Sequence, residues 1–444
     1  MSYIFKSPDK LRKLLPPQKT QARVEYYPSQ FALPFEHNGK SYVFHTLTKQ
    51  CLQCILPASC IQGTGYDELI AGYFMVPRGK DENAFYVSVL SLMNTYYADD
   101  DNNYMILPTL GCNARCIYCF EKGMVPVSMT DESAEQTARF IIGTHKAGKP
   151  VYISWFGGEP LLGKKHIDQI CRRLYDAGIK YSSSMTTNGS LITSEIVEKM
   201  KSLWNLRSLS ISMDGPEEDY RRRKNYASYH DEYHKVIEAV DMLVSAGIRV
   251  TIRSNVDLGN LSGIPILLED LKRGIRNRDG VCLYLAVLND ERLGDNDLQA
   301  WEKVISMDSL IEAAGFLPGS FRTSCTYLRT SHCLSDGGYY VISPDGELYA
   351  CEDCLPESHF GDIWNGITND KVRKEFIRMD IIREKCRGCA FLPVCTPFSH
   401  CPEEDKHCRE VELMFALHTL HHYLDSNGKN ERTQSEEAIN QGEA

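Results

Sequence analysis

The sequence predicts an α/β protein in three parts: a small N-terminal α+β domain, a central β/α region and a cysteine-rich C-terminal domain. Three observations predict this order. Apolar β-rich runs alternate with helical patterns between residues 104 and 287. The chain has 17 cysteines in 444 residues, and nine of them lie between residues 325 and 408. Alternating β and α segments are typical of a parallel sheet, curved or closed, covered by helices.

Composition excludes several classes of protein. Hydrophobic residues make up 43%, charged residues 24% and the mean hydropathy is −0.33, as in an average globular domain. A formal net charge of −10 would repel a phosphate backbone, so no nucleic-acid partner is expected. The sequence contains no 18-residue apolar run and no secretory h-region, which predicts a cytoplasmic protein with no membrane association. In that reducing compartment, dense cysteine indicates metal ligation or redox chemistry rather than disulfides.

Residues 1–100 are predicted to form the N-terminal accessory domain. Two β-like runs, Arg23–Tyr27 and Lys40–Phe44, are separated by the turn signal Asn38-Gly39. A helical pattern follows near Ala84–Tyr97. Short strands with one long helix predict a small α+β domain.

Residues 101–315 are predicted to form the central β/α region. Helical patterns lie at Ser133–Thr144, Ser194–Leu203 and Tyr233–Ala246, and a further helix is expected over 299–315. Function is expected at the carboxyl ends of the strands. The six runs predicted as strands are Tyr104–Leu110, Val151–Phe156, Lys180–Thr187, Ser208–Met213, Arg249–Val256 and Val281–Val287.

Beyond Phe321 the composition shifts to Cys, Gly and Pro and the periodicity weakens. A segment with so few apolar residues is plausibly stabilised by metal, so residues 316–425 are predicted to be a metal-held domain. Residues 426–444 are polar and are predicted to be a disordered tail.

The clearest motif is Cys112-Asn-Ala-Arg-Cys116-Ile-Tyr-Cys119, which directly follows the first predicted strand. Its spacing lets one loop place three thiolates around a single centre. Three protein ligands on a four-iron cluster leave one iron open. The alternative is a zinc site or separate core cysteines, but closed zinc sites prefer four ligands.

With Tyr118 at its aromatic position, this Cys-x3-Cys-x-aromatic-Cys motif resembles the signature of the radical S-adenosylmethionine (SAM) enzymes. The resemblance implies a partial (β/α)6 barrel of the TIM type. It also implies a [4Fe–4S] cluster whose open iron is chelated by SAM. One electron from the cluster would cleave SAM to a 5′-deoxyadenosyl radical, which abstracts hydrogen from unactivated carbon.

The segment Trp155-Phe-Gly-Gly-Glu-Pro160 follows the second predicted strand and resembles the family's Gly-Gly-Glu-Pro motif. The resemblance implies that Gly157 and Gly158 let the backbone approach the cofactor without Cβ interference. Glu159 would accept hydrogen bonds from the SAM ammonium group.

Further candidates follow the next three strands. Asn188, Ser212 and Asp214 resemble positions that face the ribose and the substrate. Arg253 and Asn255 resemble another recurrent pair, and Arg253 would reach the SAM carboxylate. The alternative reading is that Asn-Gly and Asp-Gly-Pro are ordinary turns and that Arg253 is a solvated strand end.

The C-terminal cysteines resemble the SPASM extension of the superfamily, which implies two auxiliary iron–sulfur clusters and three [4Fe–4S] clusters in all. Five residues separate Cys395 from Cys401 in this chain, whereas the family pattern has three. The identity of the ligand at Cys401 is therefore left open, and Cys354 is an alternative ligand. Cys-x2-Cys is also zinc spacing, so zinc ribbons are the other interpretation. The implied ligand sets are Cys325, Cys333, Cys351 and Cys401 for the first cluster, and Cys386, Cys389, Cys395 and Cys408 for the second.

Members with this layout mostly modify peptides, so the resemblance predicts a peptide maturase that forms a thioether crosslink in a ribosomally synthesised peptide. An auxiliary cluster would bind the substrate sulfur or accept an electron. The N-terminal domain resembles a winged-helix-like accessory region that pairs with a leader peptide by strand addition. A flavodoxin or ferredoxin would supply electrons.

Two other functions stay open. In the formylglycine-forming anaerobic sulfatase maturases, an aspartate base follows the cysteine that matches Cys351; here Glu352 takes that place, with Asp353 next. Glu352 is therefore the candidate catalytic base of that function. A zinc-stapled binding protein with an inert barrel is the alternative of another class. The basic run Arg221–Lys224 is predicted to be a solvated loop, with docking of an acidic peptide as the alternative.

Overall fold

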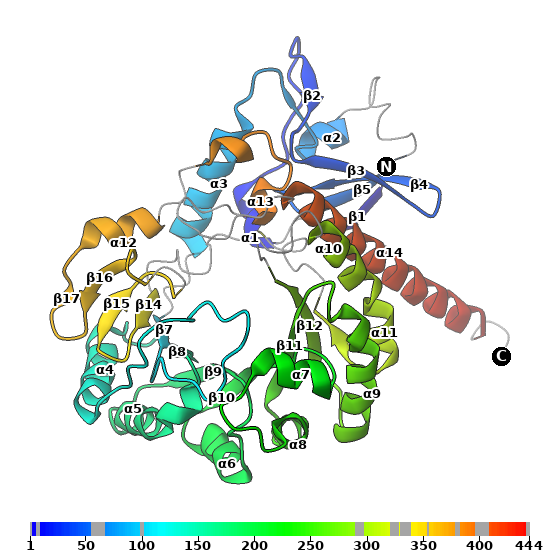
Figure 1. The fold of residues 1–444 in the computed structure, drawn as a ribbon. Helices are drawn as coiled ribbons and strands as arrows, with labels where there is room; N and C mark the ends of the chain where they lie inside the picture. The colour runs from blue at the N-terminus through cyan, green and yellow to red at the C-terminus, as the bar shows by residue number, and fades with distance from the viewer. Residues whose placement is uncertain are drawn as a thin grey trace.

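An eleven-stranded sheet forms the main body of the protein and curves through the ring of elements in Figure 1, with the strand order β13-β12-β11-β10-β9-β8-β7-β14-β15-β16-β17. Among the described residues, no helix is both long enough and apolar enough to span a bilayer. The computed structural model describes residues 2–5, 9–54, 67–97, 102–288, 297–319, 328, 339–352, 355–377, 382–395 and 408–440.

All six runs predicted as strands are parallel strands of this sheet, so the predicted parallel β/α arrangement is confirmed. A parallel sheet aligns the carboxyl ends of neighbouring strands along one edge. The strands are β7 (Asn102–Ile106), β8 (Val151–Trp155), β9 (Tyr181–Thr187), β10 (Leu206–Ser212), β11 (Arg249–Val256) and β12 (Cys282–Val287).

Helices cover the outer side of the parallel strands (Figure 1). In α5, Ile167, Ile170, Cys171 and Leu174 recur at helical spacing and are fully buried, which fixes the face turned to the sheet. The helices and short 3₁₀ turns of this region are α4 (Asp131–Thr144), η2 (Pro160–Gly163), α5 (Lys164–Asp176), α6 (Ser194–Ser202), α7 (Glu217–Lys224), α8 (Glu232–Ser245), η3 (Leu261–Gly263) and α9 (Ile264–Gly274).

The single helix expected over residues 299–315 is instead two helices, α10 (Asp297–Ser306) and α11 (Asp308–Ala313), and that prediction is wrong. Asp308 at the start of α11 is buried, and its carboxylate binds His418 Nε2 at 2.6 Å. His418 lies in the C-terminal helix, 110 residues further along the chain. The break between α10 and α11 therefore coincides with a contact that is distant in sequence. The two-residue strand β13 (Leu317–Pro318) follows.

The N-terminal part contains a four-stranded antiparallel sheet in the order β1-β5-β4-β3. Asn38 and Gly39 have φ of 48° and 70°, so the predicted turn is confirmed as the link between β3 and β4. The elements are β1 (Ser2–Phe5), α1 (Asp9–Leu14), β2 (Tyr26–Pro28), β3 (Ala32–His37), β4 (Lys40–His45), β5 (Gln50–Cys54), α2 (Asp67–Ala71), β6 (Met75–Pro77) and α3 (Glu82–Tyr97).

The C-terminal part continues the large sheet, because its first strand pairs in parallel with β7. The final helix runs through residues 426–440, which differs from the disorder predicted for 426–444. Glu431, Arg432, Glu436 and Glu437 favour a helix, so this stretch extends the helix that begins at Cys408. The elements are β14 (Tyr339–Ile342), β15 (Glu347–Tyr349), β16 (His359–Asp362), β17 (Gly366–Ile367), α12 (Asp370–Ile377), η6 (Glu384–Cys386), α13 (Leu392–Cys395) and α14 (Cys408–Asn440).

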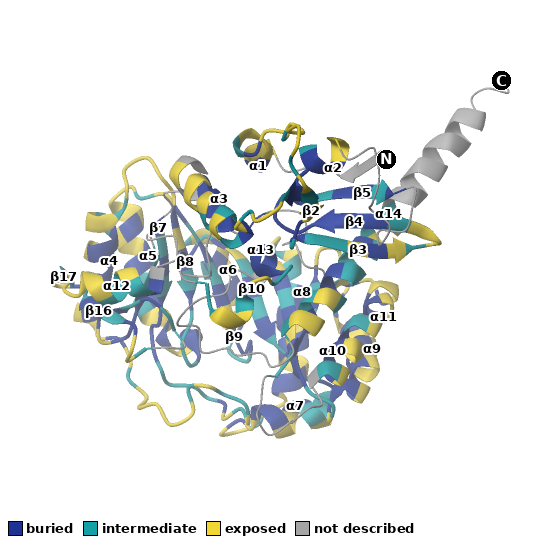
Figure 2. Cartoon of the chain, turned by 90° about the horizontal axis from the view of Figure 1, so that it is seen from above, coloured by how far each residue is buried: buried dark blue, intermediate teal, exposed yellow. Residues whose placement is uncertain are grey.

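The two ends of the chain pack together beside the barrel, where the N-terminal sheet lies along α13 and α14 (Figure 2). Phe44 of β4, Phe391 and Leu420 of α14 belong to one buried cluster. The Lys49 ammonium donates to the Pro393 carbonyl at 3.4 Å. The first and last parts of the sequence therefore share a hydrophobic core.

Candidate active site

The three cysteines of the predicted motif lie together in the loop after β7, at the carboxyl edge of the parallel strands. Cys112, Cys116 and Cys119 are each half-buried. Burial raises the pKa of Cys112 to about 11, and the Glu159 carboxylate and the Cys116 and Cys119 thiols add to that shift. Three soft thiol donors from one loop fit an iron–sulfur cluster with one open iron.

The glycine loop after β8 packs directly on the backbone that leads into the cysteine loop. Gly158 N donates to Thr109 O at 3.1 Å, and Glu159 N donates to Gly111 O at 2.9 Å. A Cβ at Gly157 would lie 2.4 Å from Thr109 O, and one at Gly158 would lie 2.4 Å from Gly111 O. Both glycines are required here by close contact between two protein loops, and the role expected of them toward the cofactor stays a prediction.

Glu159 is fully buried and joins the ends of two neighbouring strands. Its carboxylate accepts from Leu161 N at 3.1 Å, from Thr187 Oγ1 at 2.7 Å and from Asn188 N at 2.8 Å. Burial raises the pKa of Glu159, and these hydrogen bonds oppose the rise. Because protein donors occupy both oxygens, the contact expected with the SAM ammonium stays a prediction.

Asn188 connects the end of β9 to the cysteine loop. Its Nδ2 donates to Asn113 Oδ1 at 2.8 Å and lies 4.0 Å from Cys112 Sγ. The Asn113 amide in turn donates to Ser190 Oγ at 3.0 Å. These side-chain contacts hold the first part of the cysteine loop against the third strand.

Ser212, the last residue of β10, pairs with Arg253 of β11. The Arg253 side chain is exposed, and its Nε donates to Asn255 Oδ1 at 3.0 Å. Its guanidinium lies 5.8 Å from the Tyr284 ring. An exposed guanidinium oriented by an amide and an aromatic ring is a suitable carboxylate receptor, so its expected role stays open for test.

Asp214 is fully buried, and its expected role toward the ribose or the substrate stays a prediction. Its carboxylate accepts from Asn255 N at 3.0 Å and from the Tyr118 hydroxyl. It also forms an ion pair with Lys224 Nζ at 3.2 Å. Burial and the Asp214 charge raise the pKa of Tyr118, so the phenol stays protonated and donates. Tyr118 is therefore bound through its hydroxyl to the fourth strand end.

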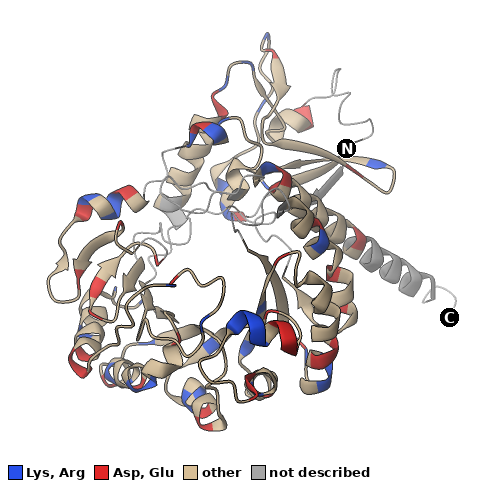
Figure 3. Cartoon of the chain, in the orientation of Figure 1, with Lys and Arg blue, Asp and Glu red and all other residues tan. Residues whose placement is uncertain are grey.

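The basic run Arg221–Lys224 is the last turn of α7, so the predicted loop is wrong. The prediction of solvent exposure is wrong for Arg223 and Lys224, which are buried. Arg223 is 2% exposed and Lys224 is 1% exposed. Arg223 Nη1 pairs with Asp257 Oδ2 at 2.8 Å. Figure 3 shows acidic and basic halves of α7, a charge order that complements the helix dipole and is visible in the sequence.

Three cysteines of the second predicted auxiliary set lie close together. Burial raises the pKa of Cys386, and the nearby Cys389 and Cys408 thiols add to the shift. Cys389 N donates to Cys386 O at 3.1 Å within a turn. Cys395 ends α13, and its side chain lies outside the described residues.

Of the first predicted set, the described residues include Cys351, which follows β15 and donates through its N–H to Ser358 Oγ at 3.2 Å. Glu352 is half-buried beside it. Cys325, Cys333, Cys354 and Cys401 lie outside the described residues.

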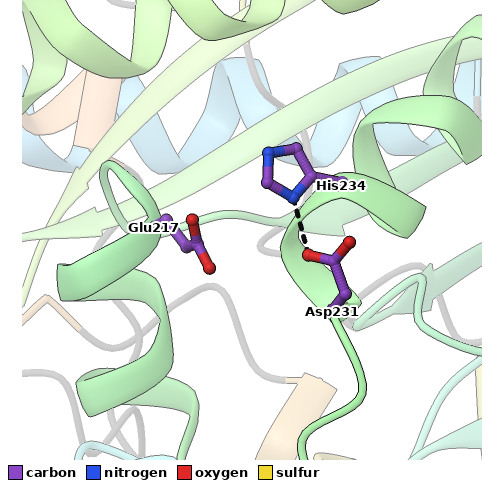
Figure 4. Close-up of side chains that lie close together, drawn as sticks. All are labelled: Glu217, Asp231 and His234. Atoms are coloured by element: carbon purple, nitrogen blue, oxygen red, sulfur yellow. Dashed lines mark hydrogen bonds and ion pairs between the residues drawn. The ribbon is translucent and has the colours of Figure 1, made fainter.

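Sequence reasoning missed a group formed by Glu217, Asp231 and His234, whose potential ligand atoms all lie within 4.8 Å of one another (Figure 4). His234 Nδ1 binds Asp231 Oδ1 at 2.6 Å. That hydrogen bond raises the pKa of His234, which favours the imidazolium. The His234 and Asp231 side chains are 55% and 61% exposed, so the group is described as a surface cluster.

The geometry places three thiols of one loop at the carboxyl edge of a parallel sheet, the arrangement of a SAM-cleaving iron–sulfur enzyme. The family model described as the radical SAM superfamily matches residues 106–260. The chain belongs to the radical SAM superfamily and is an enzyme of that class. Membership implies a [4Fe–4S] cluster and SAM as cofactors.

Relatives match the chain over most of its length. It is 25% identical over 321 residues to the AdoMet-dependent heme synthase of Methanosarcina barkeri, covering 65% of this chain and 88% of the relative. It is 25% identical over 319 residues to the serine-type anaerobic sulfatase-maturating enzyme of Klebsiella aerogenes, covering 64% and 76%. The solved structure of native anSMEcpe with bound AdoMet superposes with a TM-score of 0.59 at 17% identity over 74% of this chain and 99% of that one, which shows the same fold.

Proposed function

We propose that this enzyme uses the radical chemistry of its class to modify a peptide. The observation that carries the proposal is the cysteine loop, which Tyr118, Asn188 and the glycine loop hold at the carboxyl edge of the parallel strands. Cys112, Cys116 and Cys119 would bind the cluster. When bound, the cluster and SAM supply a 5′-deoxyadenosyl radical.

The residues around the loop would bind SAM by ordinary polar contacts. Arg253 is an exposed cation on β11, which lies between β10 and β12, and it would pair with the SAM carboxylate. Ser212, its cross-strand partner, would offer a hydroxyl to the same ligand. The glycine loop supplies backbone groups beside the cysteine loop.

Two comparisons support a peptide as the substrate. The Klebsiella aerogenes relative is named for maturing sulfatases, which are proteins. The anSMEcpe fold, seen also with a bound Cp18Cys peptide, superposes on this chain with a TM-score of 0.57. The shared fold is the ground for proposing the same substrate class for this chain.

For the product, we propose a thioether between a cysteine sulfur and a carbon of the peptide. This reaction removes one hydrogen atom from carbon, which 5′-deoxyadenosine carries away, and a proton and an electron from the thiol. The electron needs an acceptor. Cys386, Cys389 and Cys408 lie close together and, with Cys395, would hold an auxiliary [4Fe–4S] cluster that can take it.

Oxidation of cysteine or serine to formylglycine is the second candidate, favoured by the identity shared with the Klebsiella aerogenes enzyme. It requires a base near the reacting side chain. Glu352 directly follows Cys351 at the end of β15 and is half-buried, so it is the residue proposed for that role.

For the N-terminal sheet, we propose leader-peptide binding by strand addition. Its edge strands are β1 and β3. Pro34 lies within β3 and has no backbone N–H to give an incoming strand. The outer edge of β1 is therefore the better position for an added strand.

The first experiment tests the radical chemistry. The chain and its C112A/C116A/C119A variant are reconstituted anaerobically with iron and sulfide, and 5′-deoxyadenosine release is measured with SAM and dithionite. We expect the variant to bind about four fewer irons and to release 5′-deoxyadenosine only at background. Cys282→Ala, in β12 and remote from the loop, serves as the control and should behave as the natural chain. Unchanged release by the triple variant would refute the proposal.

The second experiment identifies the product by mass spectrometry of synthetic peptides that contain cysteine. A thioether lowers the mass by two hydrogens and blocks thiol alkylation. Formylglycine from cysteine loses sulfur and reacts with hydrazide probes. Loss of the hydrazide-reactive product in Glu352→Gln would favour the second candidate, and a product insensitive to Glu352→Gln would favour the thioether.

A further inference from the structure

The end of α7 and the residues that follow it lie antiparallel to the cysteine loop. Residues 223–227 and 113–117 form antiparallel backbone contacts, with a β-bridge between Ala114 and Tyr226. The backbone hydrogen bonds are Ile117 N to Arg223 O at 3.0 Å, Arg115 N to Lys224 O at 3.0 Å, and Ala227 N to Asn113 O at 3.0 Å. We call residues 223–227 the loop clamp.

Asn225 turns the chain from the helix into the loop clamp. Its φ is 47°, in the left-handed region that asparagine tolerates better than most residues, and it ends α7. Its N–H donates to Arg221 O at 3.0 Å and its carbonyl accepts from Arg115 N at 3.1 Å. One residue therefore ends the helix and begins the contact with the cysteine loop.

The Lys224 side chain adds a buried charge to the loop clamp. Its Nζ donates to the Tyr118 hydroxyl at 2.7 Å and lies 3.2 Å from Asp214 Oδ2. The lysine and aspartate side chains are 2% and 0% exposed. Removing two charges from water costs free energy that their mutual attraction often does not fully offset. Stability alone therefore poorly explains the buried pair of Lys224 and Asp214.

The charges also surround the aromatic ring of the cysteine motif. Arg223 and Lys224 lie 5.7 Å and 5.4 Å from the centre of the Tyr118 ring. Arg223 is itself fixed by Asp257 at 2.8 Å and by the Asn255 carbonyl at 3.3 Å. The loop clamp thus holds the residue between Cys116 and Cys119 by its ring and by its hydroxyl.

We infer that Lys224 is a positioning residue for the cysteine loop and that its charge, balanced by Asp214, sets the reduction potential of the cluster bound there. This inference rests on the proposed function, because it takes Cys112, Cys116 and Cys119 as the ligands. A cluster gains negative charge on reduction, so a nearby cation favours the reduced state and a nearby anion opposes it.

Two substitutions should shift the potential in opposite directions. Lys224→Met leaves the Asp214 carboxylate uncompensated, and Asp214→Asn leaves the Lys224 ammonium uncompensated. We expect Lys224→Met to disfavour one-electron reduction about tenfold, a shift of about 59 mV to lower potential, and Asp214→Asn to shift it upward. Lys224→Arg keeps the charge and should lie near the natural value.

The potentials are measured by anaerobic redox titration of the reconstituted full-length protein. Electron paramagnetic resonance follows the cluster signal that changes when SAM is added, which separates it from auxiliary clusters. Arg222→Met is the matched control, because it removes one positive charge from the same helix turn at a side chain that is 61% exposed and pairs with Asp219. The control should leave the potential unchanged.

Positioning is tested without any cofactor, by hydrogen exchange of the metal-free protein. Lys224→Met and Tyr118→Phe should speed exchange of residues 113–119 at least tenfold, and Arg222→Met should not. Equal exchange and equal potential in Lys224→Met and the natural chain would overturn the inference while leaving the proposed function intact. Absence of any SAM-responsive cluster in the natural chain would instead overturn the proposed function.

Discussion

The parallel sheet and the paired chain ends are built in different ways. In the sheet, each strand from β7 to β12 pairs with the next one along the chain, and one hydrophobic core covers them all. At the chain ends, Thr46 binds the Ala390 carbonyl across 344 residues of sequence, and the core combines strands with the last helix. Local patterns therefore describe the first region well, whereas the second depends on contacts that no local pattern contains.

The largest expected effect tests whether the chain ends form one cooperative unit. Phe44 is fully buried between β4 and the C-terminal helices, so Phe44→Ala should cost about 3–5 kcal/mol of local stability. Hydrogen exchange should rise in β3–β5 and in residues 408–420 together, with little change in the parallel strands. Tyr175→Ala, at a side chain 74% exposed, is the control. A rise limited to the N-terminal strands would mean that the ends fold separately.

A smaller effect is expected at the contact between the glycine loop and the cysteine loop. The methyl group of Gly158→Ala would meet the Gly111 carbonyl at 2.4 Å and the Leu110 carbonyl at 2.7 Å. Neither backbone can move easily, so we expect a loss of about 1–3 kcal/mol in denaturant unfolding.

Gly143→Ala is the matched substitution, because Gly143 lies in α4 with no atom within 4 Å of the added methyl. Alanine should stabilise that helix by up to about 1 kcal/mol. If alanine changes the unfolding free energy equally at Gly143 and Gly158, the close contact at Gly158 does not determine the cost of that substitution.

The chain ends should also differ from the sheet in their response to pH. Burial lowers the pKa of His45 to about 3, and the neutral ring accepts from Thr48 N at 3.1 Å through Nδ1. The unfolded chain binds this proton near pH 6.5 and the folded chain does not. Stability is therefore full above pH 6.5 and falls by up to about 1.4 kcal/mol per pH unit as the pH decreases toward 3.

Comparison of unfolding at pH 7 and pH 5 checks this expectation. His45→Gln cannot gain a charge, so the difference between its stability loss and that of the natural chain gives the contribution of this one residue. We expect a difference of about 1–2 kcal/mol. Equal losses in both proteins would show that His45 does not resist protonation in the folded state.

The smallest effect concerns a helix start in the sheet region. The Thr130 side chain accepts from Ser133 N at 3.0 Å, and Ser133 Oγ accepts from Thr130 N at 2.9 Å, a reciprocal cap on α4. Thr130→Ala should cost about 1 kcal/mol in thermal unfolding. Thr95→Ala, at an exposed hydroxyl bonded within α3, should change stability by less than about 0.5 kcal/mol.

The sequence predicted the six parallel strands, the Asn38-Gly39 turn and the cysteine loop because each depends on residues close together in the chain. It did not predict the burial of Arg223 and Lys224. Their partners, Asp257 and Asp214, stand at the ends of other strands, and only the folded sheet brings them together. The break between α10 and α11 accompanies a contact with His418, again distant in sequence.

The long sheet ends at both sides in two-residue strands, β13 (Leu317–Pro318) and β17 (Gly366–Ile367). A proline at one border and so short a strand at the other offer few free N–H and C=O groups to a passing molecule. A sheet of this width would otherwise template the stacking of copies into fibres. Its abrupt borders leave few backbone groups for pairing between copies, while eleven strands stay in one hydrogen-bonded array.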